Sequence, residues 1–222
     1  MTLFSGYTYQ LFTGALVSLS VTFFALIFGS VLGLGLGAAK IYGPHPLRYI
    51  AEAYTAVVRG VPDLIVIYLI YFGSTVALTK LTGAYVDVNG FTAGVFALGL
   101  IFGAYASDII RAGIQQVARG QKEAADALGL SKRIAFFHVI LPQAWRFALP
   151  GFSNLTIILL KQTSLISVIG LEELLRASAV VSGSTREPFY VYAIAAFMYL
   201  VMTTIATVLL RWAQSRANRG FA

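Results

Sequence analysis

The sequence contains no cysteine and few charged residues. Of its 222 residues, 11% are charged and only two, His45 and His138, are histidines. The absence of cysteine excludes a disulfide, a thiolate metal site and a catalytic thiol. The two histidines lie in no spacing that is typical of a metal site. Because a soluble domain of this length usually carries about 25% charged residues, most of the chain is not expected to face water.

Other common features are also missing. The first 39 residues carry no charge, whereas a signal peptide begins with a basic segment, so no signal peptide is expected. The chain has no Gly-x-x-x-x-Gly-Lys-Ser/Thr phosphate loop, which argues against ATP hydrolysis by this chain. No linker, low-complexity tract or internal repeat divides it. A single non-enzymatic domain over 1–222, with no catalytic residue and no metal, is the expectation.

Long apolar segments dominate what is present. The chain is 58% hydrophobic with a mean hydropathy of +0.80, and a membrane-spanning helix needs about 20 apolar residues. The sequence therefore predicts an all-α, multi-pass membrane protein. Its five expected transmembrane helices cover about 11–39, 51–72, 88–107, 149–171 and 188–210.

The basic residues predict how these spans are oriented. Most of them fall on one side of the expected membrane: Lys40, Arg48, Arg111, Arg119, Lys122, Lys132, Arg133, Arg146, Arg211, Arg216 and Arg219. Only Lys80, Arg176 and Arg186 fall on the other side. Lysine and arginine accumulate in cytoplasmic connections. The N-terminus is thus expected outside, with the C-terminus and the 111–148 connection in the cytoplasm. The net charge of +7 reflects this orientation and not nucleic-acid binding.

The 111–148 connection has a pattern of its own. Residues 122–128 are rich in helix formers, and Arg119–Glu123 and Lys122–Asp126 are spaced for i, i+4 ion pairs. Gly129 permits a left-handed helix exit. Ser131 can cap a second helix that ends before Pro142. These features fit either a rigid element that transmits a push from a soluble partner or a loop that only covers the ends of the spans.

A resemblance to a known family favours the first interpretation. Glu123-Ala124-Ala125, Gly129 and Leu141-Pro142 resemble the "EAA" loop of ABC importer permeases, with Val139 where the family has isoleucine. Three further stretches resemble the polar amino-acid permeases. They are Arg59-Gly60-Val61-Pro62-Asp63, Leu149-Pro150-Gly151 through Asn154, and Leu160-Lys161-Gln162-Thr163-Ser164-Leu165. The chain is most similar to the Q-type subunits of histidine, lysine/arginine/ornithine and opine importers.

The resemblance implies a function, a fold and partners. The chain would be a permease subunit in the bacterial inner membrane, with the type I ABC importer permease fold, serving import of basic amino acids. It would form half of the translocation path beside a second permease subunit, an M-type chain in preference to another copy. Two cytoplasmic ATPase subunits, which bind ATP and Mg²⁺, and a periplasmic amino-acid-binding protein would complete the transporter. The ATPase-coupling residues would be Glu123, Ala124, Ala125, Asp126, Leu128 and Gly129. The alternative is a secondary transporter or a channel that no ATPase drives.

Charged and polar residues within the expected spans are candidates for the substrate path, because charges in a bilayer are costly. These are Arg59, Asp63, Lys161, Gln162, Thr163 and Ser164. Lys161 could hold a substrate carboxylate or pair with Asp108, Asp63 or the partner subunit. Gly60 and Pro62 predict a break in the second span, where Asp63 could meet a cationic substrate or pair with Arg59. Asp108 is expected to be a solvated charge at a span end.

Two further patterns concern packing and the outer surface. Gly29, Gly33 and Gly37, with Gly35 added, have the spacing of small residues at close helix–helix contacts. The acidic and basic residues between the last two spans could contact a binding protein or form a solvated loop. They are Glu172, Glu173, Arg176, Arg186 and Glu187.

Overall fold

The structure, a computed structural model, describes residues 2–217, with side chains from Gly6 onward. Its helices are α1 (Thr2–Tyr42), α2 (His45–Gly60), α3 (Asp63–Thr82), α4 (Gly90–Gln115), α5 (Arg119–Ala127), α6 (Lys132–Ala135), the π-helix η1 (Phe136–Ile140), α7 (Leu141–Gln162), the 3₁₀-helix η2 (Thr163–Ile169), α8 (Leu174–Thr185) and α9 (Pro188–Ala217). No strand occurs among these residues, and the predicted all-α fold is confirmed. Arg219, which contributed to the predicted orientation, lies outside the described residues.

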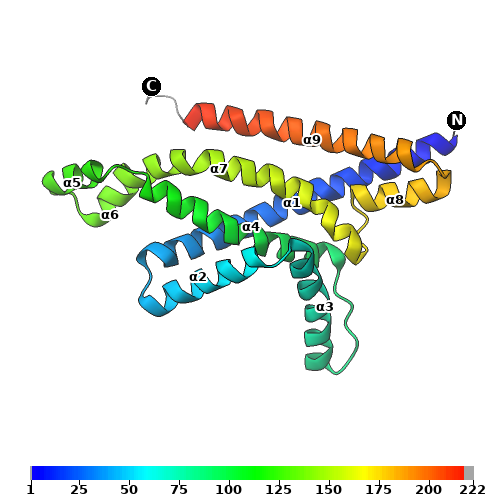
Figure 1. The fold of residues 1–222 in the computed structure, drawn as a ribbon, viewed down its shortest axis with the longest axis horizontal. Coiled ribbons are helices and arrows are strands. Elements are labelled where there is room, and N and C mark those ends of the chain that lie inside the picture. The colour runs from blue at the N-terminus through cyan, green and yellow to red at the C-terminus, as the bar shows by residue number, and fades with distance from the viewer. Residues whose placement is uncertain (1, 218–222) are drawn as a thin grey trace.

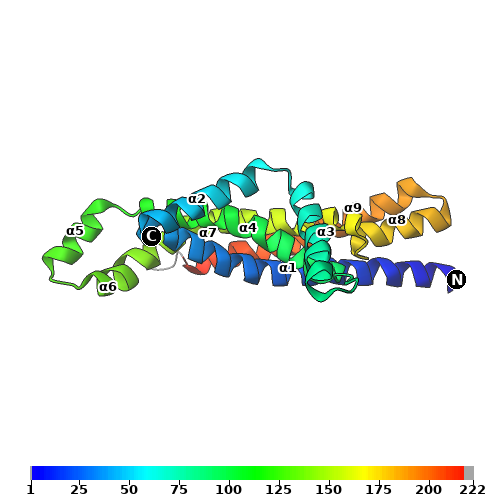
Figure 2. The same ribbon diagram turned by 90° about the horizontal axis from the view of Figure 1, so that it is seen from below.

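The long helices form an elongated bundle. α1, α4, α7 and α9 run roughly along one direction, and α5 and α6 lie at one end (Figure 1). The N-terminal end of α1 and α8 lie at the other end, as the second view also shows (Figure 2). α3 leaves this bundle and projects to one side (Figure 1). Segments that are far apart in the sequence are therefore brought to the same end of the molecule.

Five helical stretches within the described residues are long and apolar enough to cross a membrane, as predicted. They are Gly6–Tyr42, Asp63–Thr82, Gly90–Gln115, Lys132–Ile169 and Pro188–Ala217. The second differs from the expected 51–72, because Val61 and Pro62 adopt extended backbone angles and separate α2 from α3. This break was predicted, but its consequence was not. The residues before it form an amphipathic helix, and the apolar span begins at Asp63.

The fourth stretch begins earlier than the expected 149–171. Helical structure continues from Lys132 through η1 into α7, so the second helix of the 111–148 connection does not end before Pro142. The i→i+5 pattern of η1 explains the difference. The N–H of Leu141 donates to the carbonyl of Phe136, and this wider turn accommodates a proline that lacks an N–H of its own.

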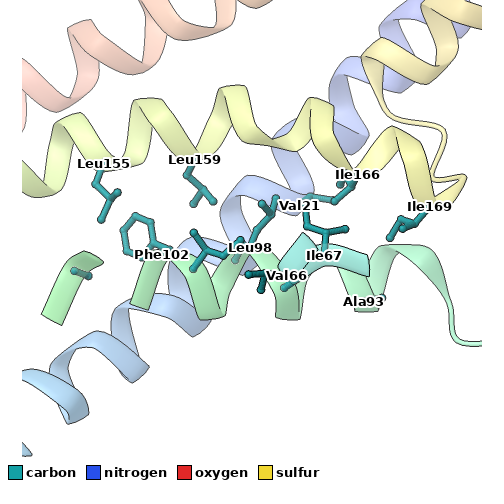
Figure 3. Close-up of a cluster of buried hydrophobic side chains, with 14 residues drawn as sticks. Val21, Val66, Ile67, Ala93, Leu98, Phe102, Leu155, Leu159, Ile166 and Ile169 are labelled. Atoms are coloured by element: carbon teal, nitrogen blue, oxygen red, sulfur yellow. The ribbon is translucent and has the colours of Figure 1, made fainter. Parts of the chain in front are cut away.

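The hydrophobic core lies where α4 packs against α1 and α7. Phe102, Leu98 and Ile101 of α4 are fully buried there. They cluster with Val21 of α1, Leu159 of α7, Ile166 of η2 and the α3 residues Val66 and Ile67 (Figure 3). Beyond these first turns α3 exposes most of its apolar side chains, for example Leu69 and Leu81.

The glycine pattern of α1 forms the close contact with α4. A β-carbon at Gly33 would lie 2.8 Å from the β-carbon of Ala106, and one at Gly29 would lie 2.7 Å from the carbonyl oxygen of Gly99. Gly37 faces Ile110 in the same way, whereas Gly35 faces open space. The packing role predicted for Gly29, Gly33 and Gly37 is consistent with this geometry, and Gly35 has no part in the contact.

Candidate functional site

α5 carries the Glu-Ala-Ala segment and lies apart from the core at one end of the bundle (Figures 1 and 2). It is nine residues long, and helices this short are marginal in water on their own. Its C-terminus is closed by two hydrogen bonds. Gly129 N–H donates to the carbonyl of Asp126 at 3.0 Å, and Leu130 N–H to that of Ala125 at 3.1 Å. Gly129 has φ +70°, so the left-handed exit predicted from the sequence is present.

The residues of the motif point in different directions. Ala125 is 2% exposed, whereas Leu128 is 78% exposed. Glu123 and Ala124 are exposed as well. The structure therefore buries Ala125 within the fold of the chain and leaves the other residues of the motif available to a partner.

The segment after α5 is a rigid base. Ser131 caps α6, as predicted, by accepting a hydrogen bond from Ile134 N–H at 3.4 Å. From there the backbone is helical without interruption into α7. Gln143 of α7 donates from its side-chain nitrogen to Gln121 Oε1 of α5 at 3.2 Å. This hydrogen bond joins α5 to α7. Neither glutamine was identified from the sequence, since no local pattern pairs them.

The charged residues of α5 have no ion-pair partner within residues 2–217. The two i, i+4 pairs suggested by the sequence, Arg119–Glu123 and Lys122–Asp126, are both open in the structure. An exposed pair of this kind contributes little to stability, so leaving it open costs the helix little. The charges remain available to a partner surface.

Two of the substrate-path candidates meet where α3 begins and α7 ends. The side-chain nitrogen of Gln162 donates to Asp63 Oδ2 at 2.6 Å. Asp63 is the first residue of α3, where a carboxylate is favoured by the helix dipole. This contact joins the break after Gly60 to the end of the fourth span, and both partners are only partly buried.

Lys161 faces another direction. Its side chain is exposed and lines a groove of about 280 Å³ between α7 and α9, together with Thr203, Thr207 and Arg211. It pairs with neither Asp63 nor Asp108 in the structure. Thr163 is fully buried and donates to the carbonyl of Leu160. Ser164 donates to the carbonyl of Lys161. The four polar residues 161–164 therefore do not share one site, because they face a groove, the Asp63 carboxylate and the protein interior.

Asp108 is the centre of a charge cluster and not a solvated end charge. Its Oδ1 lies 2.6 Å from Lys40 Nζ, and its Oδ2 pairs with Arg59. Lys40 is buried and also donates to Ser107 Oγ at 3.0 Å. The guanidinium of Arg59 lies over the Tyr105 ring, 5.2 Å from its centre. Arg59 thus pairs with Asp108 and not with Asp63, and Asp108 on α4 joins α1 to α2.

Glu173 is a second polar residue that the sequence placed wrongly. It was expected on the outer surface with its neighbours, but it is fully buried. It caps α8 by accepting from Leu175 N–H and Arg176 N–H at 2.9 and 2.8 Å. It also accepts from Tyr199 Oη of α9 at 2.9 Å and Ser18 Oγ of α1 at 3.3 Å. Burial raises the pKa of the Glu173 carboxyl, against the effect of these four donors.

Among residues 2–217, no three histidine or carboxylate side chains lie close enough together to hold a metal ion. The site instead combines an exposed helix on a rigid base, the Asp63–Gln162 contact at a helix break, and a free lysine within a span. This arrangement can transmit motion and interact with polar solutes.

Comparisons with known proteins agree with this geometry. Residues 29–219 match the family described as "Binding-protein-dependent transport system inner membrane component". The arginine ABC transporter permease protein ArtQ of Haemophilus influenzae is 40% identical over 220 residues, which cover 98% of this chain and 97% of that protein. The histidine/lysine/arginine/ornithine transport system permease protein HisQ of Escherichia coli is 34% identical over 219 residues, 97% of this chain and 96% of that one.

Solved structures show the same fold. A crystal structure of an amino acid ABC transporter with histidines contains a chain that is 36% identical, with a TM-score of 0.86 and coverage of 97% of both chains. The inward-facing MetNI methionine ABC transporter contains a chain with a TM-score of 0.77. That chain is only 18% identical and covers 95% of this chain and 97% of its own length, so it supports the fold alone.

Proposed function

The chain belongs to the binding-protein-dependent transport system inner membrane component family, and on this premise we propose that it is a permease subunit of an ATP-driven importer of basic amino acids. The similarity over nearly the whole length to permeases named for arginine and for histidine, lysine, arginine and ornithine supports this substrate class. The observation that carries the proposal is α5, an exposed helix attached to the fourth span through a continuous helical base.

In this proposal α5 receives the force generated by a cytoplasmic ATPase. Glu123, Ala124 and Leu128 contact the ATPase, while Asp126 and Gly129 maintain the shape of the element and Ala125 packs against α6–η1. When nucleotide closes the ATPase subunits, α5 moves and carries α7 with it through η1 and the Gln121–Gln143 hydrogen bond. Transport gains direction because nucleotide binding favours one conformation of the permease over the other.

The substrate path passes the Asp63–Gln162 contact, whereas Lys161 lines the separate groove between α7 and α9. A carboxylate at Asp63 offers a partner for a cationic side chain, and the free ammonium of Lys161 offers one for a carboxylate. An M-type permease subunit forms the other half of the path, and a periplasmic binding protein delivers the amino acid. ATP and Mg²⁺ bind to the two ATPase subunits and not to this chain. Five spans and the distribution of basic residues support a periplasmic N-terminus and a cytoplasmic C-terminus.

Reconstitution of the complete transporter in proteoliposomes tests this function. We expect uptake of labelled arginine or histidine that requires ATP, the binding protein and the ATPase together. Uptake by the permease subunits without the ATPase would contradict the proposal and favour a secondary transporter or a channel.

The role of α5 is tested by Ala124→Trp. A large side chain on the exposed face of α5 prevents close approach of the ATPase, so we expect at least a tenfold loss of ATPase that co-purifies with the permease. Ala84→Trp is the matched control, because Ala84 is equally exposed in the loop between α3 and α4. Equal co-purification of the ATPase with both variants would contradict the coupling role. Ala125→Trp is a poorer test, since Ala125 is buried in the fold itself.

The role of Asp63 is tested by Asp63→Asn. The variant keeps the hydrogen-bonding shape and loses the negative charge, so uptake of arginine should fall several-fold more than uptake of glutamine. Asp87→Asn removes an exposed carboxylate from the loop before α4 and serves as control. Equal loss of both substrates in Asp63→Asn would assign Asp63 a purely structural role.

A further inference from the structure

Two adjoining hollows lie where α1 ends and α5 begins. The larger, about 510 Å³, has three cationic residues in its wall, Lys122, Lys132 and Arg133, and a single carboxylate, Asp126. Its floor is aromatic. The rings of Tyr42 and Phe136 meet edge to face there with their centres 5.6 Å apart. We call this hollow the basic pocket.

The smaller hollow, about 240 Å³, is mostly apolar. Ile41, Ile114, Val117, Ala118 and Ile140 line it, with Tyr42 and the cationic residues Arg119 and Lys122 at its wall. It shares Tyr42, Lys122 and Ile140 with the basic pocket, so the two are continuous at these residues. We call it the apolar hollow. The basic pocket therefore opens directly into the apolar hollow.

The position of the two hollows is that of a membrane boundary. Tyr42 is the last residue of α1, Ile114 lies in the last turn of α4, and Ile140 directly precedes α7. α1 and α4 thus end beside the apolar hollow, the fourth apolar stretch passes it at Ile140, and the basic pocket lies next to it toward α5. Tyrosine is also the residue type that concentrates at the level of lipid headgroups.

The charges of the basic pocket do not neutralise one another. Lys122, Lys132 and Arg133 form no ion pair within the described residues, although Asp126 lines the same pocket. The pocket therefore has an excess of positive charge. Guanidinium and ammonium groups are the side chains that bind phosphate oxygens, and basic pockets beside spans bind anionic lipid headgroups.

We propose that the basic pocket binds the headgroup of an anionic phospholipid, whose acyl chain lies in the apolar hollow. A soluble acidic partner would match the charge but would leave the apolar hollow unfilled. The residues of α5 that line the basic pocket, Lys122 and Asp126, are not those of its outward face, Ala124 and Leu128. Lipid and ATPase can therefore occupy α5 at the same time. The proposal requires a membrane-embedded chain and is independent of the amino acid carried.

Lipid titration of the purified transporter complex tests the proposal. Native mass spectrometry would follow retention of phosphatidylglycerol and of phosphatidylcholine by the wild type and by the double variant Lys132→Gln/Arg133→Gln. We expect the double variant to need at least tenfold more phosphatidylglycerol for equal occupancy, with no change for phosphatidylcholine. Lys80→Gln/Arg186→Gln, which removes two exposed cations elsewhere, should bind as the wild type does.

Further variants keep the test decisive. Lys132→Arg/Arg133→Lys retains the charge and should restore phosphatidylglycerol binding, and Lys122→Gln alone should weaken it if the double variant fails to fold. Unchanged phosphatidylglycerol retention in the neutralised variants would overturn the proposal. So would loss of the ATPase from the neutralised complex with lipid retention unchanged, because the basic pocket would then be a protein interface.

Discussion

At the scale of single residues, buried polar groups differ from what their sequence positions suggest. Glu173 and Lys40 are both 3% exposed or less, and Glu173 accepts four hydrogen bonds while Lys40 donates two. A buried charge is stable only when it is paired or accepts several hydrogen bonds. Glu173 joins α1, α8 and α9, and Asp108 joins α1, α2 and α4. These two carboxylates are therefore expected to determine how helices that are distant in the sequence pack together.

Glu173→Ala should lower the stability of the folded chain by about 1–3 kcal/mol. The change removes the cap of α8 and takes the Glu173 acceptor from the hydroxyl group of Tyr199, whereas Ser18 keeps the carbonyl of Gly14. Thermal unfolding in detergent measures the effect as a lower apparent melting temperature. The neighbouring Glu172 is exposed, so Glu172→Ala should change the melting temperature little. Equal melting temperatures for the two variants would contradict the structural role of Glu173.

Asp108→Ala should cost more stability than removal of an exposed ion-pair partner. It leaves the buried ammonium of Lys40 without a counter-charge, which typically costs about 3 kcal/mol. Glu52 pairs with Arg48 at 3.0 Å and with Arg111 at 3.7 Å, and its side chain is 42% exposed, so Glu52→Ala should change stability little. Urea unfolding of the two purified variants in detergent measures the difference. A smaller loss of stability for Asp108→Ala than for Glu52→Ala would refute the idea that Asp108 stabilises the fold by pairing with Lys40 and Arg59.

At the scale of elements, close packing and continuity of helices position the candidate site. The glycine stripe of α1 lets α4 approach until backbone and side chain touch, and α4 in turn packs on α7. The π-turn at Phe136–Ile140 then lets α6 continue through Pro142 into α7. A helix break at this proline would have left α5 on a flexible connection. Because the helix continues, α6, η1 and α7 form one uninterrupted helical element next to α5.

Gly33→Val tests the α1–α4 contact. A β-carbon at this position lies 2.8 Å from that of Ala106, so the helices must separate, at a cost of about 1–3 kcal/mol. Gly35→Val adds the same side chain to the same helix with nothing within 4 Å of its β-carbon. Yield of folded protein and its melting temperature in detergent should therefore fall for Gly33→Val only. Similar losses in both variants would indicate an effect of valine on the helix and not of packing.

At the scale of the whole molecule, the shape and surface indicate a part of a larger assembly. α3 projects from the bundle with Leu69, Phe72 and Leu81 exposed (Figure 1). α9 exposes Phe197 and Leu200 among others. Apolar surface on this scale requires lipid or a second membrane subunit to cover it. The two ends of the bundle carry different elements. One end carries α5, whose charged side chains form no ion pair among the described residues, and the other end carries α8 (Figure 1).

Cysteine labelling tests the orientation of the molecule. The chain has no cysteine of its own, so single substitutions report one position each. Ser184→Cys in α8 should react with a membrane-impermeant maleimide in intact spheroplasts, whereas Gln116→Cys beside α5 should react only after permeabilisation. Both residues are exposed, so the difference reports the side of the membrane. The reverse pattern of labelling would invert the proposed orientation.

The class of the protein, the number of spans and the position of the Glu-Ala-Ala motif could all be predicted from the sequence alone. These features rest on local properties: hydrophobic runs of about 20 residues, the helix formers of 122–128, the left-handed exit at Gly129 and the break at Gly60–Pro62. Such properties depend on neighbours along the chain and can be recognised without a fold.

Only the tertiary structure decided which distant residues meet. Arg59 pairs with Asp108 in place of Asp63, Asp63 bonds to Gln162, Lys40 and Glu173 are buried, and Ala125 faces inward. Each outcome depends on which helices pack together and how each is rotated about its axis, and a one-residue rotation redirects a side chain by about 100°. Local sequence patterns carry no record of those rotations, because they arise from packing between helices far apart in the chain.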